Sequence, residues 1–494
     1  MEPTLLRVAA FATLMMFPAG SRAQEINYQT FLVGQRALGM GGAFTGLADD
    51  ASATFYNPAG LAQLQSSSLA GSLSVDAYNR YVVDDGYGSP VGIADLEHDA
   101  TPSLPLLVSI VKKFGPRDED RVRRHAVALS TINPFRVRRG YEVALRNPST
   151  GVTSTLRVSS EDRMTWWGPS YAYRITPRLA AGVSAFLSTR ELRHEEGEII
   201  ITEGDRQPDG VFRNSTLSVR DSVVEVDARQ FVFRLGALWD PNDHWRIGVM
   251  FQPPGLQVTG SSRIYEQRSF ADLITVPATA TFFRSDQGDL DAESPIPWEL
   301  RVGASYQHDE AFTAALDVSL YGPVGSANDP VRFLGQPDPE PMTGDVPQPG
   351  LFVPYQYHQV VTANVSVGVE SVIAGVVPLS AGLFTNFSGA PPVDEPTYQY
   401  SPARVNGYGA SLSVGIRSGG YDLAIGAAGL IGRGRGLRLN PNPGVDPNPE
   451  TYLPTNVEST TVYFFISGAR QAVSRLARNA YDEYLSPGDP RIPQ

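Results

Sequence analysis

The sequence predicts an all-β fold, a transmembrane antiparallel β-barrel of about 14 strands with an amino-terminal plug in its lumen. Three observations predict it. Apolar and polar residues alternate with a period of two in many segments, as in strands with two different faces. Short turns and long polar loops follow one another along the chain, as in outer-membrane barrels. No apolar run is long enough for a transmembrane helix, so strands closed into a barrel must make any membrane crossing.

Composition narrows the classes of function. Of the 494 residues, 42% are hydrophobic and 19% are charged, whereas roughly 25% charged residues are usual in a soluble domain. The formal charge is −12 and the only lysines are Lys112 and Lys113, so we expect no nucleic-acid partner, which would need a basic footprint. The chain has no cysteine, which excludes disulfides and cysteine-based metal or redox sites.

The first element is expected to be a processing signal. Arg7 precedes an apolar run over residues 8–17, and a small-x-small cleavage pattern ends at Ala23. The apolar run is too short to span a bilayer as a helix. We therefore expect residues 1–23 to be a signal peptide that is cleaved during export.

The second element, residues 24–66, is rich in glycine and does not alternate. Asn57 is a good N-cap and Pro58 suits the first helical position, so a short helix is expected to begin there. Asp49 or Asp50 can cap another turn just before it. A block of about forty residues is too small to hold its own core. Because the lumen offers walls to pack against, we expect this segment to be the plug.

The third element, residues 67–469, alternates clearly and is expected to form the barrel. Between Trp298 and Gln307 every second residue is apolar, with an aromatic residue at each end of the apolar face. Lipid-facing strands have this order, with aromatic girdles at both interfaces and polar residues toward the lumen. A soluble sandwich also alternates. The loops favour a membrane barrel, because connections longer than about 12–15 residues are uncommon in compact domains.

The connections define the strands. Short turns are expected at 115–120, 176–178, 241–243, 308–310, 374–376 and 418–420, and long polar loops at 79–103, 134–163, 191–222, 257–296, 322–357, 389–405 and 433–458. They separate fourteen runs, and an even number places both ends of the barrel on the periplasmic side. The segments 139–160 and 265–284 are either extra strands or loop hairpins. Residues 470–494 are a tail, either a periplasmic helix or a frayed terminus.

The glycine-rich segment resembles the FadL-type family of outer-membrane transporters for long-chain fatty acids and aromatic hydrocarbons. The similar stretch runs from Arg36 through Asp49 and Asp50 to Leu61. The resemblance implies a passive transporter of hydrophobic small molecules in the bacterial outer membrane, with no enzymatic activity, cofactor or metal. It also implies a fourteen-stranded barrel closed by a hatch, whose motif residues here are Asn57, Pro58, Ala59, Gly39, Gly41 and Gly42.

Two other functions stay open. A similar glycine-rich hatch occurs in barrels that serve type IX secretion, so a barrel for protein secretion or assembly is the main alternative. The other alternative is a general porin, which would show a continuous water channel. For the favoured function we expect a monomer that contacts outer-membrane lipid and lipopolysaccharide.

Apolar residues on the otherwise polar inner face have two interpretations. They line a path for hydrophobic molecules, because burying each methylene of an acyl chain is worth ~0.8 kcal/mol, or they pack the plug against the wall. Together with apolar residues of the plug, they are Phe44, Leu47, Phe55, Tyr56, Phe186, Leu238, Met250, Phe384 and Leu430.

Asn133 and Pro134 end the third predicted strand. Proline cannot donate a hydrogen bond to a β-ladder. We hypothesise that these residues open a lateral exit toward the lipid, as the kinked third strand of the family does. The hypothesis fails if residue 133 and its neighbours keep full strand pairing on both sides.

Overall fold

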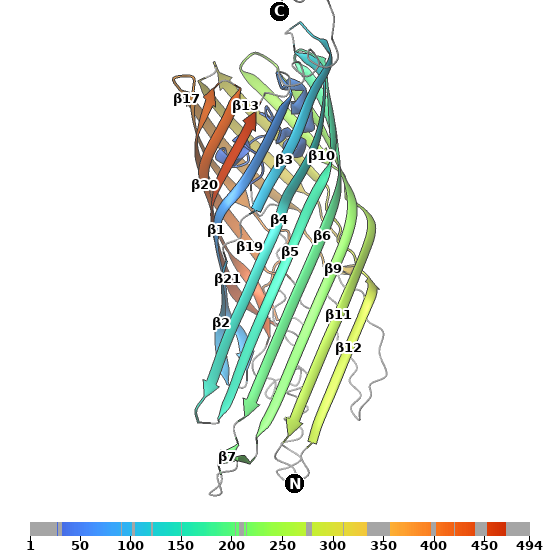
Figure 1. Cartoon of the computed structure of the whole chain (residues 1–494), viewed down its shortest axis with the longest axis vertical. Helices are drawn as coiled ribbons and strands as arrows, with labels where there is room; N and C mark the ends of the chain where they lie inside the picture. Colours follow the sequence, from blue (N-terminus) through green and yellow to red (C-terminus); the bar gives the residue numbers. More distant parts are fainter. Residues whose placement is uncertain are drawn as a thin grey trace, which may run out of the picture.

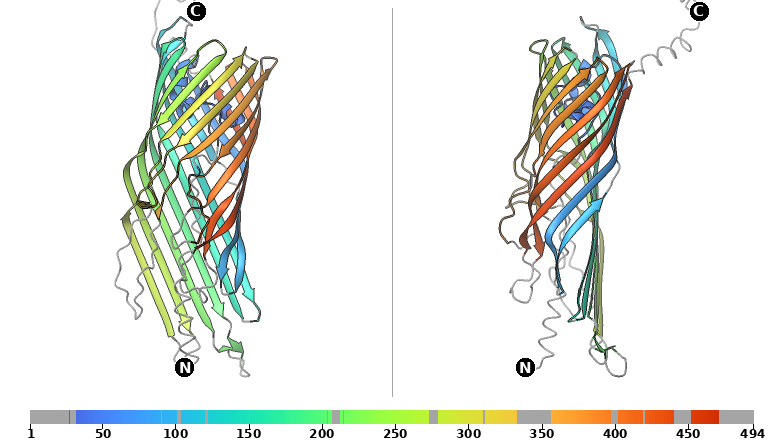
Figure 2. Two further views of the ribbon diagram at one scale, coloured as in Figure 1. Left: turned by 180° about the vertical axis from the view of Figure 1, so that it is seen from behind. Right: turned by 90° about the vertical axis from the view of Figure 1, so that its left-hand side faces the viewer.

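The computed structural model describes the plug and most of the barrel (Figures 1 and 2). The predicted signal peptide, residues 1–23, and the tail beyond Arg470 lie outside the described residues, so both stay predictions. The structure describes residues 27, 32–89, 91–100, 104–119, 122–149, 151–202, 204–206, 212–213, 215–272, 279–309, 311–332, 356–396, 402–418, 420–439 and 452–470.

Seventeen strands form one antiparallel sheet, which closes into a barrel where β1 pairs with β21. Both β2 and β3 pair with β1, and both β10 and β11 pair with β9, so each of these two pairs fills one position of the barrel. In the same way β13 pairs with β10 and β12 pairs with β11, so β12 and β13 also share one position. The barrel therefore has 14 strand positions, which confirms the prediction.

The strands of the barrel are β1 (Ser68–Ser89), β2 (Gly92–Ala100), β3 (Leu104–Arg117), β4 (Arg123–Asn147), β5 (Val152–Thr176), β6 (Leu179–Thr202), β9 (Thr216–Trp239), β10 (Trp245–Gln252), β11 (Leu256–Asp272), β12 (Thr279–Asp291), β13 (Glu299–His308), β14 (Phe312–Tyr321), β17 (Thr362–Ile373), β18 (Val377–Asn386), β19 (Arg404–Ser418), β20 (Tyr421–Leu439) and β21 (Tyr452–Arg470). Two small hairpins pair β7 (Asp205–Arg206) with β8 (Phe212–Arg213) and β15 (Val331–Arg332) with β16 (Gln356–Tyr357). Among the described residues, no helix has the length and apolar character needed to cross a membrane.

The predicted alternation is confirmed in the strands. On β13, Val302 is exposed on the outer face, whereas Glu299, Arg301 and Ser305 are buried on the inner face. Neighbouring strands are joined at all six predicted short turns, although β3 continues to Arg117, inside the turn predicted at 115–120, and these connections gather at the end of the barrel where β21 finishes at Arg470 (Figure 1). Short turns mark the periplasmic end of an outer-membrane barrel.

The strands at the other end are much longer than predicted. The stretches 134–163 and 191–222 are not loops: β4 pairs with β5 as far as Asn147 and Val152, and β6 pairs with β9 as far as Thr202 and Thr216. Most of 79–103 also forms a hairpin, from β1 and β2. The loop predictions were wrong there because, beyond the lipid, the outer face of a strand needs no apolar residues. Charged cross-strand pairs then replace the hydrophobic alternation.

The segments left open at 139–160 and 265–284 are the outer parts of the β4–β5 and β11–β12 hairpins, so they add no strand position to the barrel. The long strands from β4 to β12 project past the rest of the barrel on one side (Figure 2).

The plug lies inside the barrel near its periplasmic end (Figure 1). It contains the short helices α2 (Arg36–Gly39) and α3 (Ala53–Tyr56) and the 3-10 helix η1 (Pro58–Gln63). The cap predicted at Asn57 is confirmed, because its side chain accepts a hydrogen bond from the Ala59 amide at the start of η1. The cap predicted at Asp49 or Asp50 is wrong: Ser52 stands at the N-cap of α3 without a side-chain capping bond, and Asp50 accepts a hydrogen bond only from the Ser52 amide and hydroxyl and the Arg36 amide. Nearly all residues from 33 to 62 are buried, so the barrel supplies the core that the plug lacks.

Candidate functional site

Glycines of the barrel wall form the seat of the plug. At each of six inner-face positions, a Cβ atom would lie between 2.0 and 2.6 Å from an atom of the plug. These glycines form three direct cross-strand pairs, Gly182 with Gly236, Gly248 with Gly303 and Gly368 with Gly382. We call the set the glycine belt: Gly182, Gly236, Gly248, Gly303, Gly368 and Gly382. Because only glycine leaves this space, the belt lets the plug backbone touch the wall.

Asn57 fastens the plug to the belt. Its Nδ2 donates hydrogen bonds to the carbonyl oxygens of Thr45 in the plug, at 3.0 Å, and Ala237 in β9, at 2.9 Å. Its Oδ1 accepts from the Ala59 amide at 3.2 Å. Asn57 is fully buried, and each of these groups would be costly to leave without a partner. Asn57 therefore links two parts of the plug to the wall.

The glycine-rich part of the plug binds the opposite wall. Gly41 and Gly42 have φ values of 65° and 82°, which favour glycine. The Gly41 amide donates to the Ser411 hydroxyl, which itself donates to the Gly39 carbonyl oxygen. Asp317 in β14 accepts hydrogen bonds from the plug amides of Phe44 and Thr45, at 2.9 and 2.7 Å. The hatch motif predicted from the sequence thus lies in contact with the barrel wall.

An ion pair crosses from the plug to the wall near the periplasmic end. Arg36 lies 2.8 Å from the Glu370 carboxylate in β17 and also pairs with Asp49 within the plug. The Asp50 carboxylate accepts a hydrogen bond from the Arg36 amide. Burial inside the barrel raises the pKa of Asp50 to about 6, and the neighbouring Asp49 acts in the same direction. The surroundings of Asp50 therefore disfavour its ionised form.

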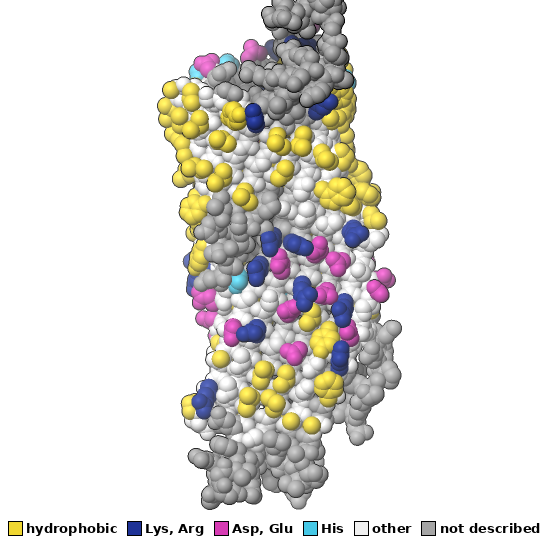
Figure 3. Space-filling model, in the orientation of Figure 1, with side chains coloured by type: hydrophobic (Ala, Val, Ile, Leu, Met, Phe, Trp, Pro, Cys, Tyr) yellow, Lys and Arg dark blue, Asp and Glu magenta, His cyan; other side chains and the backbone are white. Residues whose placement is uncertain are grey.

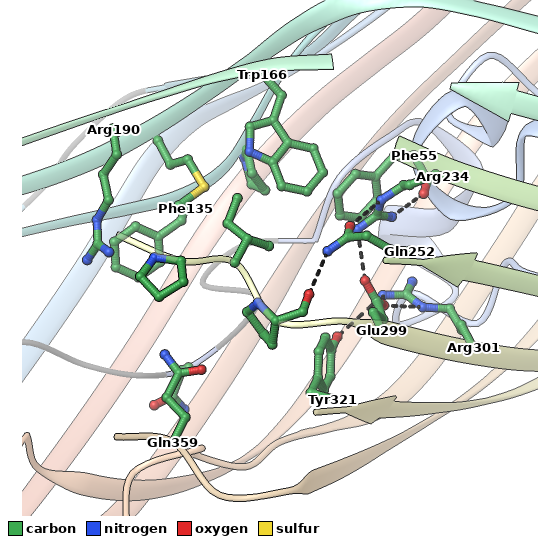
Figure 4. Close-up of a pocket in the computed structure, with 16 residues that line it drawn as sticks. Phe55, Phe135, Trp166, Arg190, Arg234, Gln252, Glu299, Arg301, Tyr321 and Gln359 are labelled. Atoms are coloured by element: carbon green, nitrogen blue, oxygen red, sulfur yellow. Dashed lines mark hydrogen bonds and ion pairs between the residues drawn. The ribbon is translucent and has the colours of Figure 1, made fainter. Parts of the chain in front are cut away.

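A cavity of about 100 Å³ lies between α3 of the plug and the barrel wall (Figure 4). Phe55 of the plug lines it, so the cavity and the plug share a surface. Apolar side chains form much of its wall, a cluster of charged residues lies at one end, and Arg190 lies beside Phe135 at the other. The other lining residues are Asn27, Pro134, Phe135, Met164, Trp166, Arg190, Arg234, Gln252, Pro295, Ile296, Pro297, Glu299, Arg301, Tyr321 and Gln359.

Two arginines and one glutamate form the charged end. Glu299 lies between them: Arg234 donates to one of its carboxylate oxygens at 2.9 Å and Arg301 to the other at 3.0 Å. All three side chains are at most 4% exposed. Buried ions are stable only when they are paired and hydrogen-bonded. Two guanidinium groups face one carboxylate here, and the Asp317 carboxylate in β14 lies near enough to interact with Arg301 as well.

Arg234 also connects the cavity to the plug. Its guanidinium group lies over the ring of Phe55, 4.1 Å from the centroid, and 5.0 Å from that of Trp166 in β5. It donates hydrogen bonds to the backbone carbonyl oxygen of Phe55 and to Gln252. Any anion that binds Arg234 therefore touches a residue on which the plug rests.

Most apolar residues predicted as a path are buried between plug and wall. Phe55 is the one that lines the cavity. Phe44, Tyr56 and Phe186 pack with it in one cluster, and Leu238 packs with plug residues in another. The remaining four are Leu47 and Met250, which are also fully buried, and Phe384 and Leu430, which are partly buried.

The sequence analysis missed the charged cluster and Trp166. Two adjacent tryptophans, Trp166 and Trp167, were the available signal, because neighbours in a strand face opposite sides and one of them must point inward. Polar residues of the strands were expected to face the lumen. The register that brings strands β9, β10 and β13 together, however, cannot be read from alternation alone.

The strand pairing around Pro134 is interrupted. The ladder between β3 and β4 ends at the pair Leu107 and Ile132. On the other side the ladder with β5 jumps from Ile132 to Phe135, so both ladders pass over residues 133–134. Residues 133–134 of β4 are therefore not paired with β3 or β5. Pro134 also lines the cavity. The lateral exit stays a prediction.

Comparisons with known proteins agree with this architecture. A FadL homologue from Pseudomonas aeruginosa superposes with a TM-score of 0.54, covering 90% of this chain and 99% of that one at 13% identity. The toluene transporter TodX of P. putida gives 0.53, with 89% and 99% covered, also at 13% identity. At such identities the likeness shows the fold alone. No curated protein matches the sequence significantly.

A family model described as outer membrane protein transport protein (OMPP1/FadL/TodX) matches residues 18–322, which is more than half of the chain. The chain therefore belongs to this family of outer-membrane transport proteins, and its barrel lies in the outer membrane.

Proposed function

We propose that the protein is a passive transporter of hydrophobic molecules that carry a carboxylate, such as long-chain fatty acids. The observation that carries the proposal is the cavity, whose apolar wall ends at the buried cluster of Arg234, Glu299 and Arg301. Membership of a transport family supports transport, and the solved structures include a transporter named for toluene. The charge at the end of the cavity distinguishes an acid from such a neutral hydrocarbon.

The two ends of the cavity suit the two ends of an amphipathic ligand. Phe135, Met164 and Ile296 offer apolar surface to an acyl chain, and each buried methylene stabilises the complex by ~0.8 kcal/mol. Arg234 and Arg301 offer guanidinium groups, which bind carboxylates through two parallel hydrogen bonds. These guanidinium groups would donate to the ligand carboxylate beside Glu299.

The route out of the cavity follows from its position. Pro134 and Phe135 line the cavity where the ladders on both sides of β4 are interrupted. We propose that ligands leave sideways between β3 and β4 into the lipid. The plug closes the lumen on the periplasmic side of the cavity, so this route needs no opening of the barrel along its axis. No covalent step is involved.

Binding of matched ligands tests the proposal. The full chain in neutral detergent is titrated with a fluorescent long-chain fatty acid and with the alcohol of the same length. Hydrogen bonds to charged groups contribute about 1.5–3 kcal/mol, so we expect the acid to bind at least about tenfold more tightly. Arg234→Gln should reduce this preference to near unity while the alcohol binds as before.

Arg190→Gln is the matched control. Arg190 also lines the cavity, but Asp162 neutralises it through two hydrogen bonds, at 3.0 and 2.6 Å. Its replacement should leave the preference for the acid intact. Equal binding of acid and alcohol by the unmodified protein would contradict the proposal that the ligand carries a carboxylate. Failure to take up either labelled ligand into cells would contradict transport itself.

A further inference from the structure

The volume of the cavity decides how much of a ligand it can hold. An apolar cavity of about 150 Å³ holds one benzene molecule, which has six carbons. The cavity beside the plug measures about 100 Å³. In proportion, it has room for the carboxylate of a fatty acid and only the first few carbons of the chain. Most of a long acyl chain must therefore lie outside the cavity while its carboxylate is bound.

One wall of the cavity is fixed in place. It belongs to the connector between β12 and β13, residues 292–298, in which Ile296 and the prolines on both sides of it line the cavity. The Ile296 carbonyl oxygen accepts a hydrogen bond from the Gly255 amide at 2.9 Å, and the Pro297 carbonyl oxygen accepts one from Gln252 at 3.1 Å. Proline also fixes its own φ angle. This wall therefore has little freedom to move away from a bulky ligand.

The connector borders the place where the ligand carboxylate would bind. Gln252, which holds Pro297, also accepts a hydrogen bond from Arg234 at 3.0 Å. Trp166 closes the same end, because the Arg234 guanidinium lies 5.0 Å from its ring centroid, and Trp166 and Ile296 belong to one buried cluster. Added methyl groups on the carbon next to the carboxylate would overlap these side chains, and overpacking a fixed wall is unfavourable.

The other end of the cavity lies beside the interrupted strand pairing. Phe135 stands away from Glu299 in the cavity (Figure 4) and directly follows residues 133–134, which neither ladder includes. On the periplasmic side of this gap, Val108 and Trp167 are half-exposed on the outer face of β3 and β5. They belong to the apolar band that covers the barrel toward its periplasmic end (Figure 3). An acyl tail that passes the gap therefore meets apolar surface.

The lumen on the extracellular side of the cavity offers the tail a less favourable surface. Buried ion pairs line it, among them Arg190 with Asp162 and Arg220 with Glu196. An acyl chain is stabilised where apolar groups and hydrocarbon shield it from water, and it gains little beside charged groups. The tail of a bound acid should therefore occupy the gap and the lipid beyond it.

We propose that the cavity selects carboxylic acids by the carbons next to the carboxylate, while the rest of the bound acyl chain passes between β3 and β4 into the lipid. The inference rests on the proposed function, because it takes the ligand carboxylate to lie at Arg234. The site accepts straight-chain acids, including those with a bulky apolar group at the far end of the chain. It rejects acids that are branched beside the carboxylate.

Three matched acids test the selection. The full chain in neutral detergent is titrated with a straight long-chain fatty acid, with the same acid carrying two methyl groups beside the carboxylate, and with one carrying a phenyl group at its far end. Overpacking should weaken binding of the branched acid about tenfold, whereas the phenyl-tipped acid should bind within about threefold of the straight one. Equal binding of the branched acid, or rejection of the phenyl-tipped one, would overturn the inference. A retained preference for acid over alcohol would then leave the proposed function standing.

A variant of the fixed wall locates the selection. Ile296→Ala widens the cavity and should let the branched acid bind almost as tightly as the straight one. Ile200→Ala is the matched control, because Ile200 in β6 is buried to the same degree and lies outside the lining of the cavity. It should reject the branched acid as the unmodified protein does. If both variants admit the branched acid, or if neither does, the connector is not the selecting wall.

Photolabelling of the unmodified protein tests where the tail lies. A long-chain fatty acid with a diazirine at its far end is bound and irradiated, and the labelled peptides are identified by mass spectrometry. We expect labels on outward residues beside the gap, such as Val108 and Trp167, and their loss when excess straight-chain acid competes for the cavity. Labels on Tyr357 in the lumen, or labels beside the gap that the competitor leaves unchanged, would overturn the tail position.

Discussion

The two ends of strand β6 show why the plug fills the lumen at the periplasmic end and charged side chains fill it at the extracellular end. Near the periplasmic end, the inner face of β6 carries Ala180, Gly182 and Ser184, and the plug rests on it. Toward the extracellular end the same face carries the buried side chains of Arg190, which pairs with Asp162, and His194, whose Nε2 lies 3.7 Å from Glu196. The alternation is the same along the whole strand.

Side-chain size therefore decides what occupies the lumen. Where the inner face is small, a Cβ would overlap the plug, so the peptide backbone itself fills the space. Where the inner face is large, ion pairs such as Arg190 with Asp162 and Arg220 with Glu196 fill it. The ligand cavity lies at the boundary between these two regions, where neither the plug nor the ion pairs fill the lumen completely.

The largest expected effect comes from filling the glycine belt. In Gly248→Leu, the new Cβ would lie 2.0 Å from the Thr45 carbonyl oxygen of the plug. Overpacking costs typically ~1–3 kcal/mol, and more where backbone atoms cannot move aside. We expect the plug to leave its seat and the barrel to conduct ions in planar lipid bilayers, where the unmodified protein stays closed.

Gly288→Leu is the control for this experiment. Gly288 lies in β12, and nothing lies within 4 Å of its Cβ position. This variant should stay closed. If the Gly248→Leu barrel also stays closed while the protein folds normally, the glycine belt does not hold the plug in place.

A smaller effect is expected from Asn57→Ala. The variant leaves the carbonyl oxygens of Thr45 and Ala237 without their donor. Each buried polar group that loses its partner costs about 1–3 kcal/mol, so plug amides should exchange hydrogen about a hundredfold faster. Mass spectrometry of peptides from residues 40–62 measures this. Asn242→Ala, which removes a similar side-chain cap from an exposed turn, should leave plug exchange unchanged.

The smallest expected effect concerns pH. The pKa of Asp50 rises from 3.8 to about 6 in the folded protein, so the folded plug prefers the neutral acid. Its contribution to plug docking is complete below about pH 4 and is lost as the pH rises through 6. Protection of plug amides, corrected for intrinsic exchange, should fall over this window. Asp50→Asn should remove the dependence, and an unchanged pH profile in that variant would show that another group is responsible.

The sequence predicted the barrel more fully than the site. Alternation and short turns such as 176–178 fix the strand positions because they depend on local chemistry. The outer hairpins escaped prediction, since charged pairs such as Arg163 with Glu191 replace the apolar pattern there. Arg234 and Glu299 come from strands far apart in sequence, and only the register of the closed barrel brings them together.

One measurement tests the central claim most directly: a crystal structure of the protein with a long-chain fatty acid that carries bromine on a carbon near its carboxylate end. We expect the anomalous bromine peak between Phe135 and Met164, and the carboxylate within hydrogen-bond distance of Arg234 or Arg301. Bromine found at the outer surface alone, with the cavity empty and the charged cluster unchanged, would contradict a ligand site at the boundary between the plug and the ion pairs of the lumen.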